Sequence, residues 1–165
     1  DGTVEDLLLQ VPVAVGDMLF VDAGTVHAIG PGVVLLETQQ TSDVTYRLYD
    51  YGRPRELHLE KGLAVMKRET AAGKVAPRAM SGFVRLIEQK YFVVDRFEVA
   101  AGGSTEVAMD GAGCLIGLSG RAVAITADGD VEMKTGQAVV VPQGSQSVIV
   151  ETGVGVSFAR CVAPV

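Results

Sequence analysis

The chain has 165 residues, of which 48% are hydrophobic, 5% are aromatic and 20 are glycine. Its formal net charge is −6, which argues against a nucleic-acid surface because such surfaces need basic residues to neutralise phosphates. No run of about 18 apolar residues predicts a membrane span, and no basic leader with an apolar stretch predicts secretion, so we expect a cytoplasmic protein.

The composition favours strands over helices. Valine is frequent and glycine punctuates the chain, a pattern typical of short strands joined by tight turns. A chain of this length can bury a core and form one domain or two small ones. We therefore predict an all-β protein.

The first half of the chain is interpreted as strands followed by a short helix. Residues 4–9 are too few for an independent helix and fit the end of an element that begins outside the sequence, so we expect a truncated chain. Residues 13–49 form apolar clusters separated by turn sequences, which predicts strands. Residues 57–67 carry apolar side chains at helical intervals, although Gly62 lowers the helical propensity. One or two helical turns are expected there.

The composition shifts to alanine, glycine, lysine and proline between the two halves of the chain. The predicted organisation is a first domain at residues 1–69, a linker at 70–81 and a second domain at 82–165. Strands are expected in the second domain at residues 91–99, 113–118, 122–126, 138–141, 147–150 and 155–162. Their regular spacing suits a sandwich or a jelly roll.

Residues 16–27 place a histidine at a fixed distance behind a turn and a short strand. A glycine–aspartate turn is followed by an apolar strand, and Gly24 introduces a kink three residues before His27. A neutral imidazole held in this way is a natural metal ligand. The spacing resembles the second motif of the cupin superfamily, in which the histidine binds the metal, except that Asp22 stands where proline is usual.

Residues 136–147 repeat the pattern with a proline, Pro142, in place of the aspartate. Ser147 stands where His27 stands in the first copy, and the second half of the chain contains no histidine. A serine hydroxyl is a poor transition-metal ligand beside imidazole. We therefore expect a second cupin-like barrel without metal ligands, whose role is packing and oligomerisation.

Residues 30–53 narrow the resemblance to one family. This segment contains a strand with a glutamate, a Thr-Ser-Asp turn, a strand with Thr-Tyr-Arg and a closing Tyr-Gly-Arg. It is similar to the bacterial type I mannose-6-phosphate isomerases. The resemblance implies that residues 1–69 are the end of a metal-binding cupin jelly-roll barrel, joined by a short helical connection to the second barrel at 82–165. It also implies that the other metal ligands, a Gln-X-His pair and a glutamate, belong to a part of the first barrel that precedes residue 1.

Four residues are candidate site residues. His27 is the candidate metal ligand, and the resemblance implies one zinc ion as cofactor. Glu37 and Arg47 have the same parity on two predicted strands, so a hairpin centred on Ser42 would place them opposite each other on one face. Arg53 is the candidate phosphate contact, because a guanidinium group suits bidentate recognition.

The resemblance assigns Arg47 to the active site, where it would stabilise an enediolate. Glu37 has two open roles, proton transfer and orientation of a substrate hydroxyl. Structural alternatives also stay open: a cross-strand salt bridge for Glu37 with Arg47, and a solvated arginine at a strand end for Arg53.

The implied activity is the interconversion of mannose 6-phosphate and fructose 6-phosphate through a zinc-stabilised enediol or enediolate. The expected partner is a phosphorylated hexose, and an oligomer or a further N-terminal segment is expected to complete the site. We expect the chain to be inactive alone for this reason. The alternative is a non-catalytic sugar-binding or scaffold cupin module.

The two cysteines, Cys114 and Cys161, lie in valine-rich, strand-like surroundings. We interpret them as reduced core residues, with a disulfide between them as the alternative.

Overall fold

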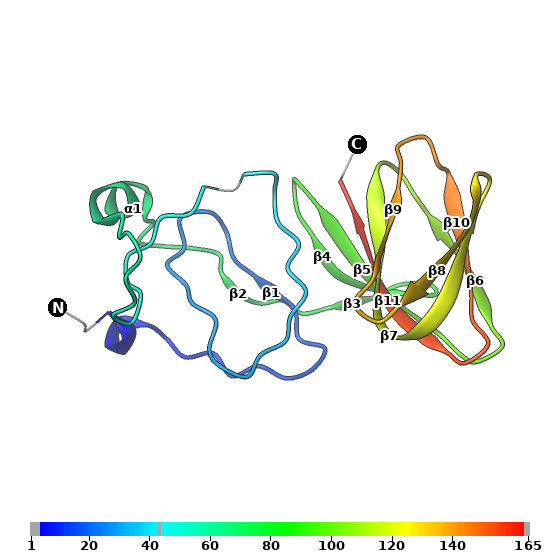
Figure 1. Ribbon diagram of the computed structural model, residues 1–165, viewed down its shortest axis with the longest axis horizontal. Helices are drawn as coiled ribbons and strands as arrows, with labels where there is room; N and C mark the ends of the chain where they lie inside the picture. The colour runs from blue at the N-terminus through cyan, green and yellow to red at the C-terminus, as the bar shows by residue number, and fades with distance from the viewer. Residues whose placement is uncertain (1–3, 43, 164–165) are drawn as a thin grey trace. The chain divides into compact units, whose positions relative to one another are not determined.

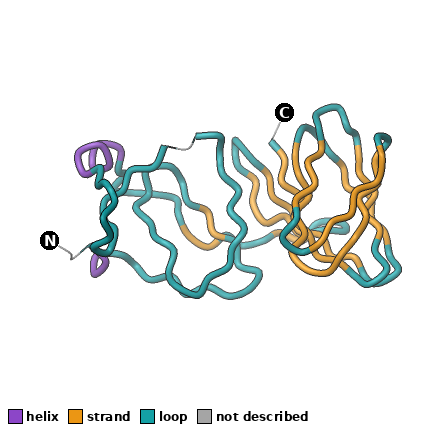
Figure 2. Tube along the Cα trace, viewed as in Figure 1, coloured by secondary structure: helices purple, strands orange, loops and turns teal. Residues whose placement is uncertain are grey.

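The computed structural model describes residues 4–42 and 44–163 and divides the chain into two compact units (Figure 1). Unit 1 is Asp1–Val75 and unit 2 is Ala76–Val165. The two units differ in how much regular structure they contain. Figure 2 shows loops over most of unit 1 and strands over most of unit 2.

Unit 1 consists mainly of segments without regular structure. Its elements are the 3-10 helix η1 (Glu5–Leu7), β1 (Leu19–Phe20), α1 (Leu59–Val65) and β2 (Gly73–Lys74). β1 and β2 pair antiparallel. Of the strands predicted in residues 13–49, the described residues contain β1 alone, because an extended segment becomes a strand only beside a neighbour that completes the hydrogen-bond ladder. Within the described part of the chain, neither η1 nor α1 is long and apolar enough to span a membrane.

Unit 1 buries no large hydrophobic side chain among its described residues. The buried residues there are Asp50 and Gly62, whereas Val15 and Val34 are fully exposed. Other exposed apolar residues of unit 1 include Leu7, Leu9, Val11, Val13, Val21, Ile29, Val33, Leu35 and Leu36. Burial of apolar surface is the dominant favourable term in folding. Unit 1 thus carries the side chains of a hydrophobic core without burying them.

Helix α1 confirms the short helix predicted at residues 57–67 and explains the glycine inside it. Gly62 is buried, and a Cβ atom at this position would overlap the side chain of Leu48 and lie 3.5 Å from the Cβ of Tyr46. Glycine lowers helical propensity, but here it allows α1 to approach the segment that carries these two residues.

Unit 2 is a curled antiparallel jelly roll. Its strands are β3 (Arg78–Ala79), β4 (Val84–Glu88), β5 (Val93–Val99), β6 (Ser104–Ala108), β7 (Gly113–Thr126), β8 (Gly129–Lys134), β9 (Ala138–Val141), β10 (Ser147–Glu151) and β11 (Val156–Val162). The strand order is β3-β4-β5-β11-β7-β10-β6, and β8 and β9 also pair with β7. The predicted all-β class is confirmed.

Alternate residues of these strands form the core of unit 2. Phe158 on β11 is fully buried and stacks on Phe97 of β5, with ring centroids 5.1 Å apart. Successive side chains of a strand point to opposite faces. Arg160 shares the parity of Phe158, and Asp95 shares the parity of Phe97, so both charged side chains point into the core, and both are buried. The other core residues are Val93, Val107, Met109, Leu115, Ala122, Ala124, Met133, Val139, Val141, Val148, Val150, Val156 and Val162.

Strand β7 is long enough to serve both halves of the jelly roll. Its first part pairs with β9 and β11, and its second part pairs with β8 and β10. The sequence predicts two strands here because Gly120 interrupts the apolar pattern, but the structure keeps one continuous strand. Gly120 has a φ of 74°, and a Cβ atom there would overlap the carbonyl group of Gly155.

We predict that Gly120→Ala destabilises unit 2 by about 1–3 kcal/mol, because alanine resists the left-handed region and its methyl group meets backbone. Gly153→Ala is the matched control, since a Cβ atom at Gly153 meets nothing within 4 Å and its φ is not positive. Urea unfolding followed by far-ultraviolet circular dichroism measures both. Equal unfolding midpoints for the two variants would contradict the prediction.

Candidate functional site

The segment that leads to His27 begins with a turn at Ala14 to Asp17. The N–H of Asp17 donates to the carbonyl oxygen of Ala14 over 3.1 Å, and the N–H of Ala14 donates to Oδ2 of Asp17 over 2.8 Å. Lys74 Nζ also lies 2.7 Å from Oδ2 of Asp17. The hydrogen bond with Lys74 is the main cause that lowers the pKa of Asp17. The turn is thereby attached to β2.

A second turn follows at Asp22, the position at which the cupin pattern has proline. The N–H of Thr25 donates to the carbonyl oxygen of Asp22 over 3.1 Å, and its hydroxyl donates to Oδ1 over 2.8 Å. Lys67 Nζ donates to Oδ2 over 3.1 Å. The hydrogen bond from Thr25, followed by that from Lys67, lowers the pKa of Asp22. Asp22 therefore stabilises this turn through hydrogen bonds, whereas the proline of the cupin pattern would stabilise it through the rigidity of its ring.

Gly24 lies inside this second turn and needs to be glycine for two reasons. Its φ is 87°, and a Cβ atom there would lie 2.8 Å from the carbonyl oxygen of Val65. The carbonyl oxygen of Gly24 accepts a hydrogen bond from the N–H of Lys67 over 3.0 Å. The predicted kink thus also docks this turn against the end of α1.

His27 follows the two turns on an exposed segment. Its Nδ1 lies 2.9 Å from the carbonyl oxygen of Thr25. Because a carbonyl oxygen only accepts, Nδ1 carries the proton and donates it, which leaves the lone pair of Nε2 available. Metal-binding histidines commonly donate their other ring nitrogen in this way, so the geometry of His27 suits a metal ligand.

The described residues supply one side chain of a metal site. No group of three or more His, Cys, Asp or Glu side chains lies together within residues 4–42 and 44–163. A catalytic zinc ion takes about three protein ligands and keeps one open position. His27 therefore fits as a single ligand, and the described part of the chain does not form a complete zinc site.

The second copy of the motif repeats the first turn in its hydrogen bonds. The N–H of Gln137 donates to the carbonyl oxygen of Lys134 over 2.9 Å, and the N–H of Lys134 donates to Oε1 of Gln137 over 3.0 Å. This is the pattern of Ala14 and Asp17. The glycine before Gln137 has a φ of 78°, as the glycine before Asp17 has a φ of 93°. The internal repeat of the sequence is therefore also a repeat in backbone geometry.

The second copy repeats the second turn as well and then diverges. The N–H of Ser145 donates to the carbonyl oxygen of Pro142 over 3.4 Å. Ser147, which replaces the histidine, starts β10, and its hydroxyl donates to Oε1 of Glu106 over 2.7 Å. The position of the candidate metal ligand is thus occupied by a side chain bonded to a neighbouring strand.

Glu37 is exposed and lies on a segment without strand structure. Asp43, the last residue of the predicted hairpin turn, lies outside the described residues. Within the described residues around it, no ladder places Glu37 opposite Arg47. The pairing of these two residues stays a prediction.

Arg47 is half-buried and bonded to the segment that precedes α1. Its carbonyl oxygen accepts from the N–H of His58 over 2.7 Å, and its own N–H donates to Nδ1 of His58 over 3.2 Å. Its guanidinium Nη1 donates to the carbonyl oxygen of Glu56 over 3.1 Å. The second histidine of the chain therefore positions the backbone of the candidate catalytic arginine.

A tight turn at residues 50–53 follows Arg47 in the sequence, and two further arginines lie at its end and just after it. The N–H of Arg53 donates to the carbonyl oxygen of Asp50 over 2.9 Å, and the two central residues, Tyr51 and Gly52, have φ values of 53° and 72°. Positive φ at both central positions defines a type I′ turn. Tyr51 is the sole non-glycine residue with positive φ in the described part of the chain, so this turn holds a strained residue.

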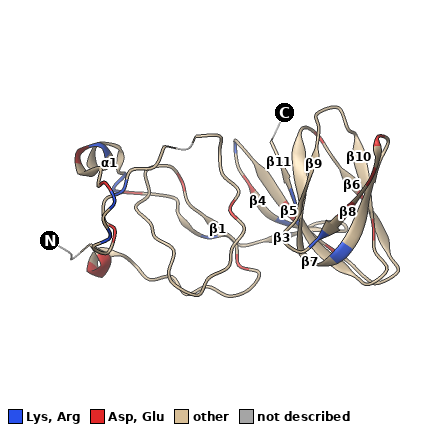
Figure 3. Cartoon of the chain, in the orientation of Figure 1, with Lys and Arg blue, Asp and Glu red and all other residues tan. Residues whose placement is uncertain are grey.

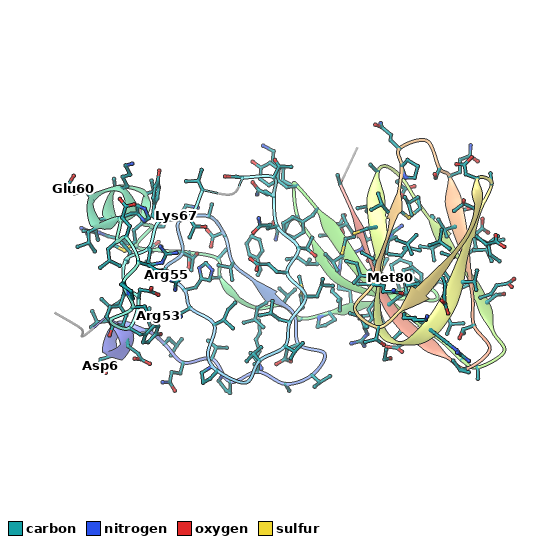
Figure 4. All side chains as sticks on the ribbon, in the orientation of Figure 1. Asp6, Arg53, Arg55, Glu60, Lys67 and Met80 are labelled. Atoms are coloured by element: carbon teal, nitrogen blue, oxygen red, sulfur yellow. The ribbon has the colours of Figure 1, made fainter. Side chains whose placement is uncertain are left out.

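The side chain of Asp50 is buried at the centre of this turn and gathers two guanidinium groups. Arg53 Nη2 donates to Oδ1 over 2.7 Å, and Arg55 donates to both carboxylate oxygens through Nε and Nη2. Figure 4 shows Arg53 and Arg55 close together on this segment. The hydrogen bond from Arg55 is the main cause that holds the pKa of Asp50 below its usual value, and charges of Arg53, Arg55 and Arg47 act in the same direction.

Two arginines thus bind one carboxylate, so these three side chains together carry an excess of positive charge. Arg53 is 59% exposed and Arg55 is 48% exposed, so both guanidinium groups face solvent while anchored to Asp50. Figure 3 shows basic and acidic residues side by side in and before α1. An exposed guanidinium pair on a buried carboxylate suits a doubly charged anion such as a phosphate.

Sequence reasoning found Arg53 but missed Asp50 and Arg55. A carboxylate three and five residues before two arginines, with a glycine between them, is a signal that was present in the sequence. It becomes meaningful only when the turn folds the two arginines back onto the carboxylate.

Comparison with known proteins gives related sequences and a related structure. The sequence matches no protein-family model. It is 41% identical to the mannose-6-phosphate isomerase ManA of Bacillus subtilis over 115 aligned residues. The aligned region covers 62% of this chain and 36% of that protein. The chain is 48% identical to the mannose-6-phosphate isomerase of Streptococcus mutans over 71 aligned residues. The aligned region covers 39% of this chain and 22% of that protein.

The crystal structure of the mannose 6-phosphate isomerase from Bacillus subtilis is similar to this chain. The TM-score is 0.57 at 22% sequence identity, over 73% of this chain and 40% of that chain. The predicted resemblance to mannose-6-phosphate isomerases and the predicted cupin jelly-roll fold are therefore confirmed. The chain spans 36% and 22% of the lengths of these two curated relatives.

Proposed function

We propose that this chain is part of an aldose–ketose isomerase that interconverts mannose 6-phosphate and fructose 6-phosphate. The observation that carries the proposal is the 41% identity over 115 residues to a protein named as such an isomerase. The arginines gathered by Asp50 add support, because the substrate of such an enzyme carries a phosphate group. The substrate class is therefore a phosphorylated hexose.

The reaction requires three tasks of the protein. First, a base removes the proton from C2 of the open-chain aldose, and a proton is returned to C1. Second, the enediolate oxygens need stabilisation as they gain charge. Third, the phosphate must be anchored so that its binding orients the sugar. We assign the stabilisation of the enediolate to Arg47 and the phosphate contact to Arg53. Glu37 serves either in proton transfer or in orienting a substrate hydroxyl.

We further propose that Nε2 of His27 is one ligand of a zinc ion. The support is the Nδ1 hydrogen bond to Thr25, which leaves Nε2 free, together with the spacing of the cupin motif. When bound, zinc would act as a Lewis acid toward substrate oxygens. Because the described residues supply a single ligand, no reaction step is assigned to the ion.

The same proposal accounts for the exposed apolar residues of unit 1. Val15, Val34 and the other exposed residues would become the core of a barrel if further strands paired with residues 13–49. We expect the 165-residue chain to be inactive by itself for this reason.

The first test combines metal content with activity. A coupled assay follows the conversion of mannose 6-phosphate to fructose 6-phosphate. It compares the 165-residue chain with the native form, meaning the protein as its source organism makes it, and zinc is measured in the same samples. We expect an active, zinc-containing native form, and we expect His27→Ala to lose both zinc and activity because an alanine offers no donor.

His58→Asn is the matched control for metal content. It changes the other histidine of the chain, whose Nδ1 accepts from the N–H of Arg47, so zinc should be retained. Zinc retained in His27→Ala would contradict the ligand assignment. A native form that binds the phosphosugar without metal and without turnover would identify a non-catalytic sugar-binding module instead.

A further inference from the structure

The two cysteines, far apart in the sequence, lie directly opposite each other in unit 2. Cys161 on β11 is the ladder partner of Cys114 on β7. Both are thiols in the structure. Opposite residues of an antiparallel pair have Cα atoms about 4.5–5.5 Å apart, within the range over which a disulfide can form.

Both thiols project from the same side of the sheet, opposite to the core of unit 2. Leu115 and Phe158 are core residues, and the alternation of strand side chains places Cys114 and Cys161 on the other face. Cys114 is half-buried and Cys161 is buried. Cys114 is thus the more exposed of the two neighbouring thiols.

The surroundings of Cys114 favour its thiolate. A hydrogen bond from the thiol of Cys161 lowers the pKa of Cys114 to about 7, against the opposing effect of burial. The thiolate is the reactive form of cysteine. Cys114 is therefore the thiol of the pair whose ionisation its neighbour favours.

We propose that Cys114 and Cys161 form a reactive dithiol that exchanges with small-molecule disulfides of the glutathione class. The thiolate of Cys114 attacks one sulfur of the small disulfide, the S–S bond breaks, and the other half leaves as a thiolate with the electron pair. Cys161 then gives up its proton and attacks the sulfur of Cys114, which releases the second small thiol. The protein loses two hydrogens and forms one disulfide, and the small disulfide is reduced to two thiols.

The two cysteines take no part in the proposed isomerase chemistry. The candidate residues of that chemistry belong to unit 1, whereas both cysteines belong to unit 2. The dithiol therefore stands or fails independently of the proposed function.

The test treats the folded 165-residue chain with oxidised glutathione at neutral pH and follows intact mass. We expect the protein to lose the mass of two hydrogens, peptide mapping to join Cys114 to Cys161, and dithiothreitol to reverse the change. Cys161→Ser should instead retain one glutathione on Cys114, because no neighbouring thiol can displace it. Cys114→Ser should react roughly 10-fold more slowly than the unaltered chain, since Cys161 lacks the same activation.

Cys161→Ala serves as a second variant in which the buried site stays apolar, and circular dichroism confirms that each variant is folded. The proposal is overturned if the unaltered chain keeps an unresolved glutathione adduct, or if its thiols react only after unfolding in urea. It is also overturned if Cys114→Ser reacts as fast as the unaltered chain.

Discussion

Replacing Asp95 by asparagine should lower the free energy of unfolding of unit 2 by about 3–5 kcal/mol, the usual cost of breaking a buried ion pair from one side. Asp95 is fully buried. Its Oδ1 accepts from Nε of Arg85 over 2.8 Å, and its Oδ2 accepts from Nη2 of Arg85 and of Arg160. One carboxylate therefore compensates two guanidinium groups inside the jelly roll.

Arg160 is buried, so water cannot readily replace the carboxylate charge that Asp95→Asn removes. Its side chain is 6% exposed, its Nη1 donates to the carbonyl oxygen of Ala108, and its Nε is buried without a hydrogen-bond partner among the described residues. The hydrogen bond from Arg85 to Asp95 also raises the pKa of Arg85, which keeps that side chain charged. Removal of the carboxylate charge would leave Arg160 without a charged partner among the described residues in a low-dielectric interior, and would leave Arg85 with Glu88 as its carboxylate partner.

Urea unfolding of the full chain, followed by circular dichroism of the strands, measures this effect. Glu88→Gln is the control, because Glu88 is 52% exposed and pairs with Arg85 and Arg78 at the surface, where ion pairs contribute little. A combined replacement of Asp95, Arg85 and Arg160 by Leu, Met and Met should be far better tolerated than Asp95→Asn, since apolar side chains leave no buried charge. If Asp95→Asn unfolds at the same urea concentration as Glu88→Gln, the network is not stabilising.

Under the proposed function, Arg47→Lys should lower the kcat of mannose 6-phosphate isomerisation about 100-fold, which is the usual effect of removing one preorganised donor from a developing negative charge. The guanidinium of Arg47 is held by the carbonyl oxygen of Glu56, and its backbone is held by His58. Lysine offers a point charge and cannot reproduce the planar fork of donors. Because the charge on the enediolate develops in the transition state, the loss should fall on kcat.

Arg53→Lys provides the comparison for this measurement. Arg53 is mainly exposed and is anchored to Asp50, so its replacement should raise KM for the phosphorylated sugar and leave kcat less affected. Steady-state kinetics on the active form of the protein separates the two. An increase of KM alone in Arg47→Lys would exclude Arg47 from enediolate stabilisation.

Much of unit 2 could be predicted from the sequence, because its strands alternate in polarity and end at glycine turns. β5, β9, β10 and β11 begin and end within two residues of their predicted bounds. β3, β4, β6 and β8 were not predicted. In β8 five of the six residues are exposed and Met133 alone is buried, which removes the alternation. β7 was predicted as two strands because its continuity depends on a left-handed glycine, and a sequence pattern does not show this.

The candidate site was less accessible to prediction. The cupin spacing located His27, and the structure adds the 2.9 Å distance from Nδ1 to the carbonyl oxygen of Thr25, from which the tautomer with a free Nε2 is inferred. The role of Asp50 depends on a type I′ turn with a tyrosine in the left-handed region, which sequence propensity disfavours. Gly62 is a second residue whose role could not be predicted from the sequence, because the role depends on the close approach of Leu48 and not on helical propensity.

The internal repeat has a consequence for the loops of unit 1. The two copies of the motif lie 120 positions apart, as Gly16 and Gly136 show. At the same offset, β9 corresponds to the region of β1, and β10 and β11 correspond to residues 27–31 and 36–42. In unit 2 these three strands share one partner, β7, and the described residues of unit 1 form no strand equivalent to β7. The three corresponding regions of unit 1 thus lack this shared neighbour among the described residues, and of these regions only that of β1 contains a strand, which pairs with β2 instead.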